Sequence, residues 1–123
     1  MHELAICSGL VDAVLDELRA LDPPPERVNS VRVVAGALHQ LVPEFLDTAY
    51  ELLTRETPAA GSTLELVIRP VTATCHACTW SGVIDPPFFR CGDCGTTTIE
   101  LTSGNELYLD RLNVEQAETK ETG

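Results

Sequence analysis

A chain of 123 residues is long enough for one domain, or for one small domain that carries an inserted unit. Its 8 Lys and Arg face 19 Asp and Glu, and the resulting net charge of −11 disfavours nucleic-acid backbones and favours metal cations or a basic protein surface as partners. The longest apolar run is far shorter than the roughly 18 residues of a membrane span, and acidic residues interrupt the first apolar segment, so we expect a soluble cytoplasmic protein that is neither secreted nor membrane-bound.

The first predicted element is an amphipathic helix that begins almost at the first residue and carries its apolar stripe over residues 4–21. Apolar residues recur there at spacings of three and four, which is typical of one buried helix face. The stripe consists of Leu4, Cys7, Val11, Val14, Leu18 and Leu21. Three prolines, from Pro23 to Pro25, end the helix because proline cannot continue it. On this stripe we expect Cys7 to be a small buried apolar residue rather than a reactive thiol.

Two strands and a second helix follow. Residues 28–35 are rich in β-branched side chains and predict a strand whose buried face carries Val31, Val33 and Ala35. A helix over 43–55 begins with Pro43 in its first turn, where proline is favoured. Residues 64–69 alternate between apolar and other side chains and predict a half-buried strand.

The last part of the chain predicts strands at 96–101 and 107–112, with a turn at 103–105 between them. The order of elements favours an α+β fold in which two helices pack on a small mixed β-sheet. We expect a first domain from residues 1–70 and 104–114, a zinc-binding insertion at 71–103 with two CxxC knuckles, and a disordered acidic tail at 115–123.

The cysteines of the insertion predict a metal site. Cys75-His-Ala-Cys78 and Cys91-Gly-Asp-Cys94 are two Cys-x-x-Cys pairs separated by twelve residues, and such pairs bind Zn²⁺ in closed tetrahedral sites. Disulfide pairing is the first alternative, but the chain shows no secretory signal. Two others are a nucleic-acid-binding zinc ribbon, although Arg90 is the only cation of the segment, and a rubredoxin-like iron site in electron transfer.

The chain start is a second candidate metal site. The terminal amine, the deprotonated His2 amide and the His2 imidazole can chelate one ion, and the Glu3 amide or an outside group would complete a square of nitrogens. That geometry favours Ni²⁺ or Cu²⁺ over zinc. The residues alone leave open the alternative that His2 is an ordinary solvated side chain at a frayed end.

Several motifs together resemble the HypA family: the Met1-His2-Glu3-Leu4 start, the helix with Cys7, Leu38 through Glu44, both Cys-x-x-Cys pairs, and Gly104-Asn105-Glu106-Leu107. The resemblance runs from Met1 to about Glu115. It implies a nickel metallochaperone for the maturation of [NiFe]-hydrogenase, and in some organisms of urease, and it implies a protein that is not an enzyme.

The resemblance also implies the site residues and partners. Met1, His2 and Glu3 would form the nickel site, whereas Cys75, Cys78, Cys91 and Cys94 would hold a structural zinc ion. The partners would be HypB, a GTPase, the hydrogenase large-subunit precursor and, in some organisms, urease maturation proteins.

Two histidines depart from these simple assignments. His76 and Thr79 stand where many HypA proteins have proline or glycine around the cysteines, and His76 is an alternative zinc ligand that could displace a thiolate. Because four sulfurs already complete the shell, we expect it not to do so. We expect His39 to be partly buried and hydrogen-bonded, with an additional nickel ligand as the alternative.

Overall fold

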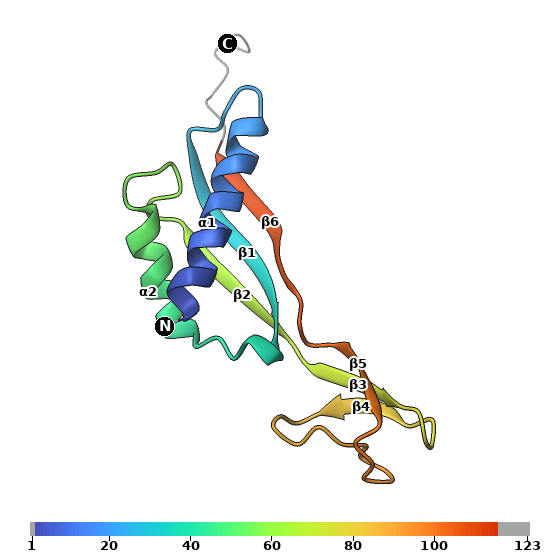
Figure 1. Cartoon of the computed structure of the whole chain (residues 1–123). Helices are drawn as coiled ribbons and strands as arrows, with labels where there is room; N and C mark the ends of the chain where they lie inside the picture. The colour runs from blue at the N-terminus through green and yellow to red at the C-terminus, as the bar shows by residue number, and fades with distance from the viewer. Residues whose placement is uncertain (1, 116–123) are drawn as a thin grey trace. The chain divides into compact units, whose positions relative to one another are not determined.

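The computed structural model describes residues 2–115 (Figure 1). The predicted acidic tail 115–123 lies outside the described residues, except for Glu115, which ends the last strand. The helices are α1 (His2–Ala20) and α2 (Pro43–Thr54), with a short 3₁₀ helix, η1 (Ala37–His39). The strands are β1 (Arg27–Gly36), β2 (Thr63–Arg69), β3 (Val71–Cys75), β4 (Ser81–Ile84), β5 (Ile99–Ser103) and β6 (Leu107–Glu115). Within 2–115 no helix is long and apolar enough to cross a membrane.

Contacts divide the chain into two compact units, and both units draw on separated segments. The helical unit contains residues 2–33, 41–66 and 109–115, and the cysteine unit contains Val34–Gln40 and Val67–Tyr108. The predicted zinc-binding insertion, 71–103, lies wholly within the cysteine unit. That unit also contains 34–40, 67–70 and 104–108, which the prediction had placed in the first domain.

The core of the helical unit comes from the predicted apolar stripe of α1. Cys7, Val11, Val14 and Leu18 are buried there, whereas Leu4 and Leu21 at the two ends are 44% and 39% exposed. α1 and α2 lie side by side (Figure 1). The buried residues that α2 contributes are Leu46, Ala49, Tyr50 and Thr54. The predicted α+β class with two helices is therefore confirmed.

The strands form two three-stranded sheets rather than one. β2, β1 and β6 lie in that order in the first sheet, and β4, β3 and β5 in the second. In the second sheet β3 is antiparallel to both neighbours, with Ala73 opposite Gly82 on one side and Leu101 on the other. The sequence did not predict β3 or β4. It also placed β5 too early, because Thr96–Thr98 form a turn in which the Thr98 amide bonds the Thr96 hydroxyl.

The cysteine unit has an apolar core of its own, made by Val71, Ala73 and Ile84 with Leu38 and other residues packed against them. Its backbone is tightly packed at Gly36 and Gly104. A Cβ on Gly36 would lie 1.9 Å from the Gly104 carbonyl oxygen, so only glycine fits there. Two backbone hydrogen bonds, Gly36 N to Glu106 O (2.7 Å) and Leu38 N to Gly104 O (2.9 Å), hold η1 in this unit.

Candidate metal centre

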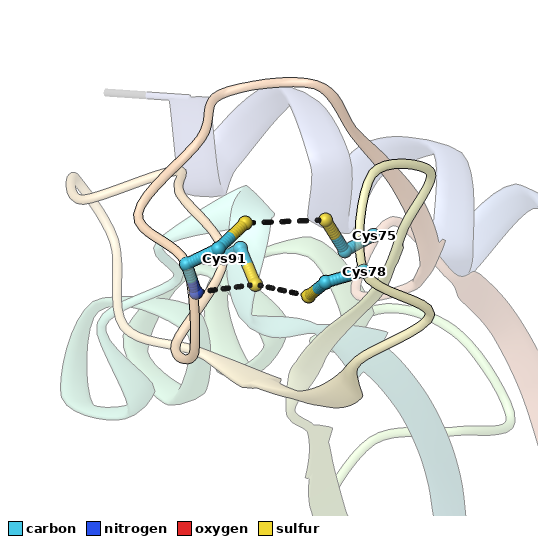
Figure 2. Close-up of side chains that lie close together, drawn as sticks. Cys75, Cys78 and Cys91 are labelled. Atoms are coloured by element: carbon cyan, nitrogen blue, oxygen red, sulfur yellow. Dashed lines mark hydrogen bonds between the residues drawn. The ribbon is translucent and has the colours of Figure 1, made fainter.

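The four cysteines of the two pairs form one cluster. Cys75 ends β3 and Cys78 lies in the turn after it, while Cys91 and Cys94 lie in the second turn, and Figure 2 shows Cys91 facing the first pair. All four sulfurs lie within 4.8 Å of one another, with Cys75 to Cys94 at 3.8 Å and Cys78 to Cys91 at 3.5 Å. A tetrahedral zinc ion with Zn–S bonds of about 2.3 Å separates its sulfurs by about 3.8 Å. The cluster therefore fits zinc.

The two turns have the same backbone design. The Cys75 sulfur accepts the Ala77 amide, and the Cys91 sulfur accepts the Asp93 and Cys94 amides, all at 3.3 Å. Such N–H donors stabilise thiolates. Each turn closes with the amide of the fourth residue after its first cysteine, from Thr79 to Cys75 O and from Gly95 to Cys91 O. Both closing residues have positive φ, 66° at Thr79 and 77° at Gly95, a conformation that suits glycine and strains threonine.

These hydrogen bonds make the thiols unequal. Burial raises the pKa of Cys91, but the amides of Cys94 and Asp93 and the neighbouring thiols outweigh burial and lower that pKa to about 6. At Cys78 a backbone hydrogen bond involving Trp80 lowers the pKa, and the Cys91 thiol, burial and the other thiols outweigh it and raise the pKa to about 12. The hydrogen bonds therefore favour the thiolate form at Cys91, and binding of a metal ion releases protons from the cluster.

Trp80 packs beside the cysteine turns through its backbone and its ring. Its carbonyl accepts the Cys75 amide at 2.7 Å. A Cβ on Gly82 would lie 2.6 Å from the indole, and one on Gly92 would lie 2.8 Å from it, so both glycines leave room for the ring. The only tryptophan of the chain is thus packed against the second cysteine turn.

The remaining cysteine and histidines lie outside the cluster. Cys7 is fully buried, and burial, followed by the Asp47 charge, raises its pKa to about 11, as expected for an inert apolar residue. His76 is exposed and its Nε2 lies 3.2 Å from Glu100 Oε1, so it is not poised to replace a thiolate. His39 is half-buried and its Nε2 hydrogen bonds with the Asn105 carbonyl at 3.0 Å, which confirms the predicted structural role.

The structure describes the predicted nickel site only in part. Met1 and the side chain of His2 lie outside the described residues, and α1 begins at His2. Glu3 is in the first turn and is only 4% exposed. Its Oε2 accepts the Val42 amide at 3.0 Å. The sequence did not predict this contact with the start of α2. The one signal for it in the sequence is that Val42, the residue before α2, has no side chain that can cap the helix.

Beside Glu3 lies an apolar groove between the start of α1 and α2. Its volume is about 320 Å³, and its lining residues are Glu3, Leu4, Phe45, Thr48, Ala49 and Leu52. Leu4, Phe45 and Leu52 are 44%, 53% and 51% exposed. Exposed apolar side chains that gather in this way mark an interaction surface.

Comparison with known proteins agrees with this arrangement. A family model described as "Hydrogenase/urease nickel incorporation, metallochaperone, hypA" matches residues 1–114. The chain is 36% identical over 115 residues to hydrogenase maturation factor HypA 2 of Bradyrhizobium diazoefficiens, which covers 94% of this chain and all of that protein. It is 34% identical over 119 residues to hydrogenase maturation factor HypA of Solidesulfovibrio magneticus, with the same shares covered.

Solved structures support the fold. The solution structure of the Ni metallochaperone HypA from Helicobacter pylori matches with a TM-score of 0.63 and 19% identity, covering 94% of this chain and 98% of that one. A second solution structure of a HypA protein also has a TM-score of 0.63, with 21% identity over 93% of this chain and 96% of the other. With the family match over residues 1–114, these findings show that the chain belongs to the HypA family of nickel metallochaperones for hydrogenase maturation.

Proposed function

We propose that the chain start binds the nickel ion that this metallochaperone transfers, through Met1, His2 and Glu3. The supporting observation is that α1 begins at His2, so the His2 and Glu3 amides lie in the first turn, where backbone N–H groups are outside the i to i−4 ladder of the helix. Deprotonating such amides for a metal ion does not break helical hydrogen bonds. The terminal amine, the His2 amide and imidazole and the Glu3 amide would then offer four nitrogens in a square.

The second part of the proposal is that Cys75, Cys78, Cys91 and Cys94 hold a structural zinc ion. Four sulfurs within 4.8 Å complete a tetrahedral shell and leave no open position for chemistry. The nucleic-acid alternative is not favoured because Arg90 is the only Lys or Arg between Cys75 and Gly95, and its guanidinium lies over the Phe88 ring, 5.7 Å from the centroid. Iron would give the purified protein strong visible absorption, whereas zinc would leave it colourless.

Metal analysis of untagged protein tests both parts. His2→Ala should abolish stoichiometric nickel binding and leave zinc near one per chain. Cys78→Ser should lower zinc occupancy and leave the helical circular dichroism of α1 and α2 in place. If His2→Ala retains wild-type nickel affinity, the chain start is not the nickel site.

We also propose that the protein acts in the cytoplasm as a carrier and not as an enzyme. Its partners would be a HypB-type GTPase, the [NiFe]-hydrogenase large-subunit precursor and, in some organisms, urease maturation proteins. Support comes from family membership, because a maturation factor must meet both a nickel source and an acceptor protein.

The groove beside Glu3 is our candidate docking surface for the GTPase. α2, which lines the groove, also carries the exposed acids Asp47 and Glu51, and α1 has no Lys or Arg before Arg19. An apolar partner surface flanked by Lys or Arg therefore fits it in shape and charge. Because Glu3 lines the groove, a partner seated there would touch the proposed nickel site and could change its ligands during transfer.

A further inference from the structure

We infer that the Glu3 side chain positions the proposed nickel site and is not itself a metal ligand. The inference deepens the proposed function, on which it rests, by separating the two parts of Glu3. Glu3 is only 4% exposed, and its Oε2 accepts the amide of Val42, 39 residues away along the chain, at 3.0 Å. We therefore assign the carboxylate to this contact and the backbone amide of Glu3 to the nickel ion.

The start of α2 explains why this contact exists. Helices commonly begin with a capping box, in which a Glu or Gln at the third helical position bonds the amide of the N-cap residue. α2 has Val42 as its N-cap, which makes no side-chain cap, and its third helical position is Phe45, which cannot accept a hydrogen bond. Glu3 supplies from α1 the carboxylate that α2 lacks, and it thereby ties the first turn of one helix to the start of the other.

The same contact prepares the first turn for a metal ion. Met1 and His2 directly precede Glu3, so a side chain held at Val42 fixes where the helix begins and which way its first amides point. Groups that orient metal-ligating atoms from outside the ligand set typically change metal affinity by roughly 10–100-fold when they are removed. A carboxylate that turned to bind nickel would instead take its acceptor away from the half-buried Val42 amide, at a cost.

Three variants of the untagged, zinc-loaded full chain test the inference. Glu3→Gln keeps an oxygen that can accept the Val42 amide, and we expect nickel affinity within about threefold of wild type and an unchanged visible spectrum of the nickel complex. Glu3→Ala removes the acceptor, and we expect nickel to bind about tenfold more weakly or worse. Glu44→Gln, in the exposed first turn of α2, removes one nearby charge without altering the contact between Glu3 and Val42. It should leave the nickel affinity and the visible spectrum unchanged.

Hydrogen exchange at the Val42 amide reports the contact itself, without nickel. Glu3→Ala should speed this exchange, whereas Glu3→Gln and Glu44→Gln should largely preserve its protection. Wild-type nickel affinity in Glu3→Ala would overturn the inference. A loss in Glu3→Gln as large as in Glu3→Ala, or a changed visible spectrum, would also overturn it, because the carboxylate would then be a ligand.

The two levels of the proposal fail separately. Nickel retained by His2→Ala removes the chain-start site altogether, whatever Glu3 does. Nickel lost by His2→Ala but bound normally by Glu3→Ala leaves the site in place and removes only the positioning role. If Glu3→Ala loses helical circular dichroism or zinc, Glu3→Gln alone tests the role of Glu3. A carboxylate ligand predicts weaker nickel binding in Glu3→Gln, whereas a positioning group predicts nearly unchanged binding.

Discussion

Gly36→Ala should destabilise the cysteine unit strongly, although the φ of Gly36, −75°, is open to any residue. The obstacle is space. The new Cβ would lie 1.9 Å from Gly104 O and 2.6 Å from Asn105 N, and both are backbone atoms that cannot rotate away. Separating the two segments breaks the hydrogen bonds from Gly36 N to Glu106 O and from Leu38 N to Gly104 O. At a net value of about 0.5–1.5 kcal/mol each, their loss costs about 1–3 kcal/mol.

Urea unfolding followed by tryptophan fluorescence measures this effect in the right unit. Trp80 is the only tryptophan and belongs to the cysteine unit, so its signal reports that unit. With m values of roughly 1–3 kcal/mol/M, the expected loss lowers the midpoint by about 1 M. Zinc must be kept saturating, because zinc loss alone would unfold the site.

Gly9→Ala is the matched control. Gly9 is an exposed residue of α1, and a Cβ there meets nothing within 4 Å, so alanine should stabilise that helix by about 0.5–1 kcal/mol. This gain should show in the helical circular dichroism and leave the Trp80 transition in place. An unchanged Trp80 midpoint in Gly36→Ala would refute the argument from close backbone packing.

Four further predictions concern the metal sites and the groove. Thr79→Gly removes about 1–2 kcal/mol of backbone strain at the positive φ, and the greater chain entropy of glycine in the unfolded state partly offsets this gain. In competition with a chromophoric chelator, this variant should bind zinc about 2–5-fold more tightly, whereas Gly95→Ala should bind zinc more weakly. After zinc removal at pH 8, Cys91, whose pKa is lowered to about 6, should be alkylated rapidly, and Cys7, which is buried with its pKa raised to about 11, at least about 100-fold more slowly; equal rates would show an open helix core. One extra residue before Met1 should abolish stoichiometric nickel binding with zinc unchanged, and normal binding by such a protein would rule out the terminal amine as a ligand. Phe45→Ser, at a side chain already 53% exposed, should weaken GTPase binding about tenfold in calorimetry without loss of helix content, and unchanged affinity would exclude the groove.

The parts of the fold that the sequence predicts are those with a local period. The stripe from Cys7 to Leu18 gives α1 its buried face, and Pro43 marks the start of α2, because both signals lie within one helix. Each Cys-x-x-Cys pair is equally local, since its two-residue spacing places both of its sulfurs on one turn. Alternation in residues 64–69 likewise marks β2.

The parts that the sequence does not predict depend on contacts between distant segments. β3 consists of Val71-Thr72-Ala73-Thr74-Cys75. Its small and hydroxyl side chains make the alternation of apolar and polar residues weak, and its cysteine indicates only a metal ligand. The assignment of Val34–Gln40 to the cysteine unit depends on the close approach of Gly36 to Gly104. The bond between Glu3 and Val42 joins two helices and follows no sequence period.

The interleaving of the two units limits how the molecule can be dissected or recombined. The chain passes between them four times, after residues 33, 40, 66 and 108, so no single scission releases either one. An excised peptide spanning 67–108 would lack Leu38, which packs on Val71, Ala73 and Ile84, and would lack the Leu38 donor to Gly104. Gene fusion or domain shuffling therefore cannot transfer the cysteine unit by a single cut in the chain, and this unit must be inherited together with the helical unit.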